Sequence, residues 1–92
     1  MRHMLNTLFI ISEDSYLSLD NQNAVINRED GTMVKIPLHN LEQILSFSYK
    51  GASTAFMGEC AARGIGLCFY TPKGKFLARV SGSNNGNVLL RK

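Results

Sequence analysis

Apolar and polar side chains alternate along much of the first half of the chain, a period-two pattern that is typical of β-strands. In "YLSLD", for example, Leu17 and Leu19 fall on one face and the polar side chains on the other. Alternation of this kind, or a run of β-prone residues, predicts strands over residues 6–12, 16–20, 24–28 and 32–37. Asp30-Gly31 joins the last two, because glycine readily takes the positive φ of a tight hairpin. We expect these four strands to form a meander.

The spacing of apolar residues becomes helical in the middle of the chain. "LHNLEQILSF" is ambiguous, and we interpret it as one helical turn over residues 39–41 followed by a buried strand over residues 43–47. A helix is expected next, because Ser53 can cap its first turn and a broad apolar stripe follows. Arg63 falls in the last turn, where the helix dipole favours a cation, and Gly64 fits the left-handed position that ends a helix.

Two further strands complete the predicted fold. "GLCFY" over residues 66–70 is a continuous apolar run, and "FLARV" over residues 76–80 alternates after the Pro-Gly turn "TPKGK". The sequence therefore predicts a mostly β fold with one helix (α+β). It would be a small antiparallel β-sheet or sandwich-like domain of about six to seven short strands. The helix, near residues 53–63, would pack on that sheet.

The last ten residues are expected to leave this domain. "SGSNNGN" is polar and rich in glycine and asparagine, as loops and linkers are. "VLLRK" then opens another apolar element that the chain does not complete. We therefore assign residues 1–82 to a β-rich domain and residues 83–92 to a linker and the start of a further element.

Composition limits the class of protein. The chain has 92 residues, of which 45% are hydrophobic, so one folded domain with a modest core is expected. Two cysteines without a secretion signal favour a reducing compartment over a disulfide framework. The early apolar run Leu8–Ile11 is too short to span a membrane. We expect a cytoplasmic protein with no membrane association.

Charge is distributed unevenly along the chain. Residues 1–59 carry four basic and seven acidic side chains, whereas residues 60–92 carry six basic and no acidic ones. A segment of one sign is typical of a protein that meets a polyanion, although a solvated surface explains it equally well. Basic residues on a hairpin and a helix end could contact a phosphate backbone without reading base sequence. The candidate DNA-backbone contacts are Arg63, Lys73, Lys75 and Arg79.

The residues alone indicate no catalytic or metal site and no cofactor. Cys60 and Cys68 lack the short spacing of a zinc knuckle, and we interpret both as structural thiols pointing into the core. "ARGIG" between them is a helix stop, because it lacks the lysine and the strand-to-helix order of a phosphate-binding loop. His39 is interpreted as a turn residue, and the adjacent acids at 13–14 and 29–30 as solvent-facing pairs.

The segments taken together resemble a known family. "LNTLFIISEDSYLSLDNQNAVI", "KIPLHNLEQILSFSYKGAS", "CAARGIGLCFYTPKGKFLARVSG" and "GNVLLRK" are similar in order and spacing to the amino-terminal region of the CRISPR-associated Cas-one family. The likeness covers essentially the whole chain and is greatest to the form found in type I-C systems. Each motif alone would be weak evidence, but the four in order are specific.

The resemblance implies a function for a longer protein. Members of the family are metal-dependent DNA endonucleases and integrases that insert new spacers into the CRISPR array. A Glu/His/Asp set in a helical carboxy-terminal domain holds their Mg²⁺ or Mn²⁺. No residue of this chain corresponds to that set, so the chain alone is expected to be inactive and "VLLRK" to begin the missing helical domain. Its implied roles are homodimerisation and bracing of double-stranded DNA, with the Cas-two protein as partner of the dimer.

Two other interpretations stay open. The domain could serve dimerisation alone, with its charges merely solvating the surface. It could also be a free-standing β-rich module that binds a protein or a nucleic acid and has no catalytic role.

Overall fold

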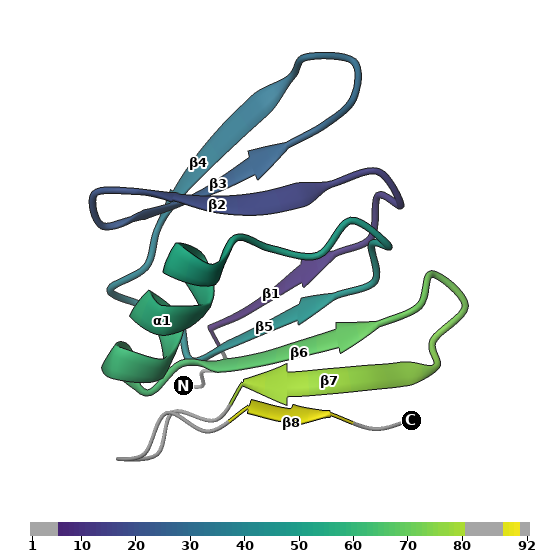
Figure 1. The fold of residues 1–92 in the computed structure, drawn as a ribbon. Coiled ribbons are helices and arrows are strands. Elements are labelled where there is room, and N and C mark those ends of the chain that lie inside the picture. The colour runs from purple at the N-terminus through teal and green to yellow at the C-terminus, as the bar shows by residue number, and fades with distance from the viewer. Residues whose placement is uncertain (1–5, 81–87, 91–92) are drawn as a thin grey trace.

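The computed structural model describes residues 6–80 and the backbone of residues 88–90. These residues form eight strands and one helix (Figure 1). In chain order the elements are β1 (Thr7–Ile10), β2 (Tyr16–Asp20), β3 (Asn23–Asn27), β4 (Met33–Pro37), β5 (Gln43–Ser46), α1 (Thr54–Arg63), β6 (Gly66–Tyr70), β7 (Phe76–Val80) and β8 (Val88–Leu90). The predicted class, mostly β with one helix, is confirmed.

The strands form two sheets. Sheet A has five strands in the order β1-β5-β6-β7-β8, and sheet B has three in the order β2-β3-β4. Sheet B is an antiparallel meander whose last turn contains Gly31 at φ 92°, as the Asp-Gly dipeptide predicts. In sheet A, β1 runs parallel to β5 and β5 runs parallel to β6, whereas β7 and β8 continue antiparallel.

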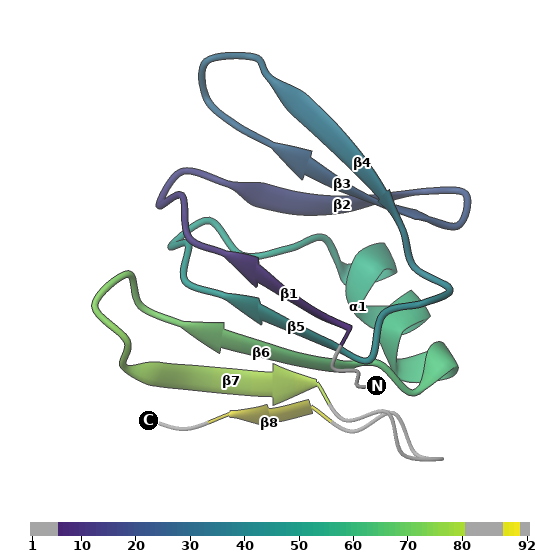
Figure 2. The same ribbon diagram turned by 180° about the vertical axis from the view of Figure 1, so that it is seen from behind.

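The expected four-stranded meander is wrong at its first strand. β1 pairs with β5, with Thr7 opposite Gln43, and not with β2. Two parallel neighbours need a long crossover between them, and sheet B supplies the crossover from β1 to β5 just as α1 supplies the one from β5 to β6. The purely antiparallel arrangement is therefore corrected to a mixed sheet. Both crossovers lie over the same face of sheet A (Figures 1 and 2).

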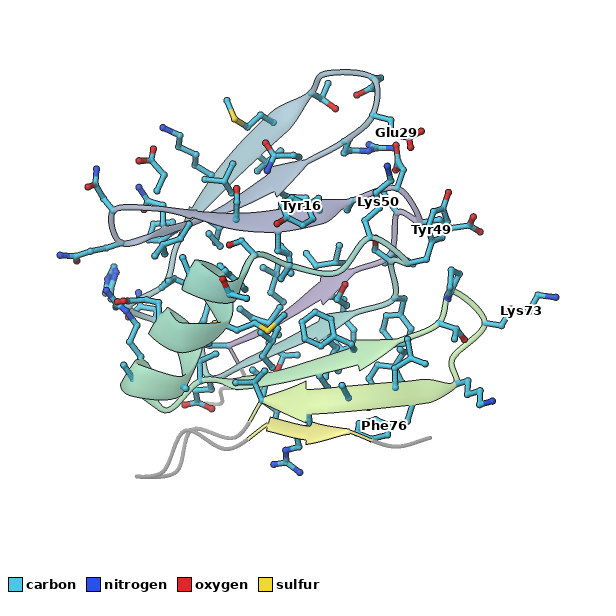
Figure 3. The ribbon with its side chains drawn as sticks, viewed as in Figure 1. Tyr16, Glu29, Tyr49, Lys50, Lys73 and Phe76 are labelled. Carbon is cyan, nitrogen blue, oxygen red and sulfur yellow. The ribbon has the colours of Figure 1, made fainter. Side chains whose placement is uncertain are left out.

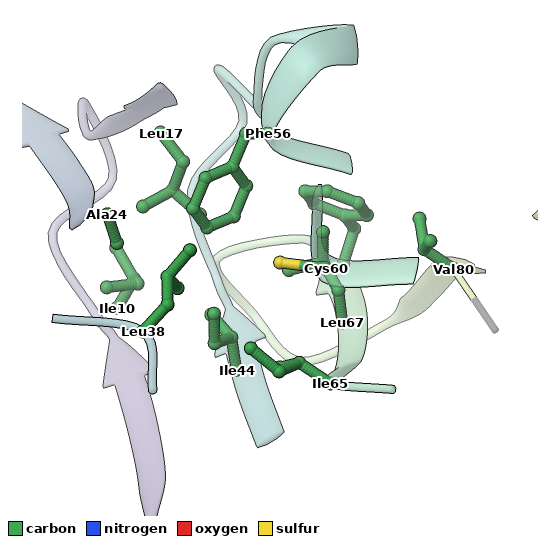
Figure 4. Close-up of a cluster of buried hydrophobic side chains, with 11 residues drawn as sticks. Ile10, Leu17, Ala24, Leu38, Ile44, Phe56, Cys60, Ile65, Leu67 and Val80 are labelled. Carbon is green, nitrogen blue, oxygen red and sulfur yellow. The ribbon is translucent and has the colours of Figure 1, made fainter. Parts of the chain in front are cut away.

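The core fills the space between that face, sheet B and α1 (Figure 4). Ile44, Leu67 and Val80 lie opposite one another on three adjacent strands, and each is at most 1% exposed. Phe56 from α1 and Leu17 from sheet B are completely buried in the same cluster. Because side chains alternate between faces along a strand, Phe9, Leu45, Cys68 and Arg79 form a row on the opposite, outer face.

The ends of α1 follow the predicted capping. The Oγ of Ser53 accepts a hydrogen bond from the backbone N–H of Phe56 at 3.1 Å. At the other end Gly64 has φ 74°, and the N–H of Ile65 donates to the carbonyl of Cys60 at 2.9 Å. Both ends therefore satisfy backbone groups that a helix leaves without intrahelical partners.

Two local expectations are corrected. Residues 39–40 form a turn closed by a hydrogen bond from the N–H of Leu41 to the carbonyl of Leu38, not a helical segment. Val88–Leu90 form strand β8, which pairs with β7, so the element that begins there is a strand and not a helix. The predicted linker, residues 81–87, lies outside the described residues. The division into domains stays a prediction.

A buried serine joins the loops at one end of the molecule. Ser48 is 2% exposed, and its Oγ contacts the backbone carbonyls of Glu13, at 2.9 Å, and Ser15. The same oxygen accepts a hydrogen bond from the N–H of Lys50 at 3.0 Å. One side chain thus connects the β1–β2 loop to the loop that precedes α1. Ser15 is equally buried, but its Oγ has no hydrogen-bond partner among the described residues.

We predict that Ser48→Ala lowers the free energy of unfolding by about 1–3 kcal/mol, because it leaves buried backbone groups without partners. Ser15→Ala is the matched control. It removes a buried hydroxyl that makes no hydrogen bond within the described residues, so the free energy of unfolding should stay the same or rise. Urea unfolding of both variants checks the prediction, and equal destabilisation by the two would contradict it.

Candidate nucleic-acid interface

Two of the four predicted basic residues lie together at the tip of the β6–β7 hairpin. Lys73 and Lys75 flank Gly74, whose φ of 98° permits the tight turn. Two hydrogen bonds to Thr71 close the turn. The N–H of Gly74 donates to the carbonyl of Thr71 at 2.8 Å, and the N–H of Lys75 donates to the Oγ1 of Thr71 at 3.0 Å. Both lysines are exposed, and neither makes an ion pair with a residue of the described part of the chain.

The other two predicted residues lie elsewhere. Arg63 ends α1, just before β6, whereas the lysine hairpin follows β6. The length of β6, about 16 Å at 3.3 Å per residue, therefore lies between Arg63 and the two lysines. The Nε of Arg63 donates a hydrogen bond to the carboxylate of Glu59 at 2.6 Å, one helical turn away. Arg79 is exposed on the outer face of sheet A, opposite Cys68. The structure therefore brings together Lys73 and Lys75 but not the full set.

Four loops meet at the end of the molecule that carries the hairpin. The parallel strands β1, β5 and β6 all point toward this end, so the segments that follow them gather there together with the β3–β4 turn (Figure 1). Lys50 extends toward Glu29, with 2.7 Å between Nζ and Oε2, while Lys73 points away from the hairpin tip (Figure 3). Tyr49, beside Lys50, is 62% exposed.

Some of the cations at this end of the molecule form ion pairs with carboxylates and others do not. The carboxylate of Glu29 raises the pKa of Lys50 through a hydrogen bond and through its charge. Arg28 pairs with Asp14 at 3.7 Å. Because these cations already have acidic partners, the hairpin lysines are the exposed positive charges here that a phosphate would meet without displacing a carboxylate.

An apolar cleft opens beside the hairpin. Its volume is about 350 Å³, and its walls come from the segment before α1, from the helix itself and from the β6–β7 hairpin. Leu77, which is 38% exposed, stands at a register shift, because Phe69 and Tyr70 pair with Ala78 and Phe76 and leave Leu77 as the extra residue. The lining residues are Ser48, Tyr49, Lys50, Gly51, Ala52, Met57, Phe69, Thr71, Pro72, Leu77 and Ala78.

Sequence reasoning missed this gathering of loops. Ligand-binding groups commonly collect at the carboxyl ends of parallel strands, but the rule applies only once the strands are known to be parallel. Period-two alternation in residues 6–12 predicted a strand without predicting its neighbour. The helical i, i+4 spacing of Glu59 and Arg63 was a readable sign that Arg63 would be paired.

The two cysteines face different environments. Cys60 is completely buried in the core, and both thiols are free. Cys68 is only half-buried on the outer face of sheet A, so the expectation that both point into the core is wrong for Cys68.

The described residues hold no metal-binding group and no membrane-spanning helix. No three His, Cys, Asp or Glu side chains within residues 6–80 come close enough together to hold a metal ion. No helix of the described segments is long and apolar enough to cross a membrane.

Solved structures with a similar architecture include Cas1 proteins. A Cas1 protein from Thermotoga maritima superposes with a TM-score of 0.73 at 16% identity, over 86% of this chain and 25% of that chain. A chain of a Cas6-RT-Cas1–Cas2 complex superposes with a TM-score of 0.73 at 19% identity, over 82% of this chain and 8% of that chain. At these identities the likeness defines the class of fold alone.

Sequence comparison supplies the family. The family model described as CRISPR associated protein Cas1 matches residues 8–92. A CRISPR-associated endonuclease Cas1 from Chlorobaculum tepidum is 37% identical over 92 residues, and one from Rhodospirillum rubrum is 36% identical over 92 residues. The chain covers 27% of the length of each of these relatives. The chain belongs to the Cas1 family.

We predict that Cys60 resists thiol reagents at pH 8 in the folded chain and reacts once urea unfolds it. Burial, together with the nearby charge of Glu59, raises the pKa of the Cys60 thiol from 9.0 to about 12. The folded state therefore keeps a proton that the unfolded state loses, so this thiol lowers stability as the pH rises from about 9 toward 12. Labelling followed by mass spectrometry checks the prediction, with half-buried Cys68 as the internal control. Equal labelling rates of the two thiols would contradict it.

Proposed function

We propose that this chain is the amino-terminal domain of a metal-dependent DNA endonuclease/integrase that inserts new spacers into the CRISPR array. Its role there is to brace double-stranded DNA and to self-associate. The family match and the two relatives named as endonucleases support the enzyme class. The observation that carries the DNA role is the hairpin, where Lys73 and Lys75 present two cations without acidic partners among the described residues. We also propose the type I-C form, because the resemblance of the sequence is greatest to that form.

DNA contact would use phosphates and not base edges. The lysines stand on a turn, and a hairpin tip with two cations suits a backbone that presents regularly spaced negative charges. A DNA complex of a related Cas1 protein superposes with a TM-score of 0.65 at 13% identity. In our proposal Arg79 adds a contact from the outer face. Arg63 does so only if a phosphate replaces Glu59 as its partner.

Self-association would cover exposed apolar side chains. Phe9, Ile11, Met33 and Val34 are each at least 50% exposed. A homodimer buries such surface when the same patch of both copies is self-complementary. We propose that the dimer assembles with Cas2, because one structural relative is part of a Cas6-RT-Cas1–Cas2 complex. The free thiols support a cytoplasmic location.

Catalysis would belong to another part of the enzyme. The described residues do not assemble a metal site, whereas Mg²⁺ or Mn²⁺ is what stabilises charge on a phosphodiester in enzymes of this class. We propose that the metal is held outside the residues described here. The part played by this chain's own residues is to hold and orient the DNA.

We predict that Lys73→Ala/Lys75→Ala reduces the slope of log K for duplex DNA against log salt by about 1.8, because each lost phosphate contact contributes about 0.9. The measurement is fluorescence anisotropy with a labelled duplex from 50 to 200 mM salt. The affinity should fall similarly for unrelated DNA sequences, since the contacts carry no base readout.

The matched control is Lys35→Ala/Lys50→Ala, which also removes two charges but takes them from ion pairs with Asp20 and Glu29. This variant should leave the slope unchanged. Single Arg63→Ala and Arg79→Ala variants test the remaining candidates one at a time. If neither the hairpin nor the arginine variants change the slope, the DNA role is lost and the domain serves association alone.

A further prediction concerns catalysis. The 92-residue chain should leave plasmid and branched DNA uncut with either Mg²⁺ or Mn²⁺, whereas a full-length relative such as the Chlorobaculum tepidum Cas1 endonuclease serves as the active control. Agarose gels measure the outcome. Metal-dependent cleavage by the chain alone would place the catalytic residues within it. It would overturn the proposal that this domain only holds DNA while another part of the enzyme carries the catalytic metal.

A further inference from the structure

An ion pair between Glu29 and Lys50 connects two loops at the end of the molecule that carries the lysine hairpin. Glu29 lies in the β3–β4 turn of sheet B, and Lys50 lies in the loop between β5 and α1. Their side chains meet with 2.7 Å between Nζ and Oε2 (Figure 3). The side chain of Glu29 is 60% exposed and that of Lys50 is 36% exposed, so an anion in solution can reach the pair.

Backbone hydrogen bonds hold both partners in place. The N–H of Lys50 donates to the Oγ of buried Ser48 at 3.0 Å, which fixes the loop that carries the lysine. The N–H of Glu29 donates to the Oδ2 of Asp14 at 3.1 Å, which ties the β3–β4 turn to the β1–β2 loop. Opening the ion pair therefore requires only the two side chains to move.

Glu29 is the carboxylate that controls the charge of Lys50. Asp14 also raises the pKa of Lys50, but by a smaller effect than Glu29. Both oxygens of Asp14 are already engaged, because Oδ1 lies 3.7 Å from the Nε of Arg28 and Oδ2 accepts the N–H of Glu29. Without the charge of Glu29, Lys50 would have no other ion-pair partner within the described residues.

Lys50 borders the same surface as the lysine hairpin. It lines the apolar cleft of about 350 Å³ together with Thr71 and Pro72, which lead into the hairpin turn. Lys73 follows Pro72 directly and is exposed. A phosphate backbone that contacts the hairpin would reach Lys50 across this cleft, where the carboxylate of Glu29 occupies the ammonium group and repels the phosphate.

We propose that Glu29 masks Lys50 and so limits the number of phosphates that this surface binds. While the carboxylate holds the ammonium group, the two hairpin lysines make the contacts, and when the ion pair opens Lys50 becomes a third. Glu29 acts through Lys50 and is a positioning residue that does not itself contact DNA. Exposed ion pairs contribute little to stability, so the mask can be removed without unfolding the domain. The inference rests on the DNA contact in the proposed function.

Glu29→Gln tests the mask, because it nearly keeps the size of the side chain and removes its charge. The slope of log K for duplex DNA against log salt should become steeper by about 0.9, the contribution of one further phosphate contact. Fluorescence anisotropy with the same labelled duplex and salt range measures the change. The double variant Glu29→Gln/Lys50→Ala should return the slope to that of the parent, since it lacks the cation that the first substitution releases.

Asp20→Asn is the matched control. It also removes one carboxylate and frees one lysine, because Asp20 pairs at 2.7 Å with Lys35, whose side chain is 51% exposed. Asp20 ends β2 beside the β2–β3 turn, at the opposite end of sheet B from the β3–β4 turn, so the slope should stay unchanged. An equal increase in Asp20→Asn and Glu29→Gln would overturn the mask. So would an increase that persists in the double variant, because a general loss of negative charge would then explain it.

The remaining outcomes separate the mask from the proposed function. If Lys73→Ala/Lys75→Ala lowers the slope and Glu29→Gln leaves it unchanged, the mask is overturned and the DNA contact stands. If neither variant changes the slope, the DNA contact is lost together with the mask. A Glu29→Gln chain whose circular dichroism spectrum departs from that of the parent would also contradict the mask, because the ion pair would then be structural.

Discussion

The parallel pairing of β5 with both β1 and β6 is the constraint on which the rest of this structure depends. Parallel neighbours cannot be joined by a short turn, so each pair requires a long crossover. Sheet B provides the first and α1 provides the second, and both cover one face of sheet A. That face becomes the core around Ile44 and Leu67, while the row from Phe9 to Arg79 is left on the other face. The loops at the carboxyl ends of these strands then meet, and the lysine hairpin that follows β6 is one of them.

Local structure was predictable from the sequence because its causes are local. The caps at Ser53 and Gly64 depend on the side-chain hydroxyl and on the absence of a Cβ, and both act where the sequence places them. The Asp-Gly hairpin likewise follows from a few residues. The partner of β1 was not predictable in this way, because an alternating strand states which face is buried and not which strand lies beside it. The face on which Cys68 lies was not predictable for a different reason, because the continuous apolar run GLCFY shows no alternation.

The candidate site was predictable in part. Lys73 and Lys75 were recognisable as a pair because both lie in the Pro-Gly turn between the two flanking strands. Arg63 was grouped with them by its position in the sequence, but α1 holds it against Glu59 at the far end of β6. The apolar cleft beside the hairpin had no sequence signal, because its walls come from segments that are distant in the chain. The residues alone did not indicate the family, which the resemblance of the sequence motifs predicted and the family model confirmed.

The use of a whole sheet as a crossover also has a consequence for the order of folding. Sheet B and the β6–β7 hairpin are made of contacts between neighbouring segments, which form quickly, whereas Thr7 must wait for Gln43. Closing so large a loop is entropically costly until the intervening meander has shortened the effective distance. On a ribosome, which releases the chain from its amino terminus, β1 would emerge first and dock late, with a hydrophobic edge exposed in the interval. Low φ-values in β1 beside higher ones in sheet B would be the kinetic signature of that order.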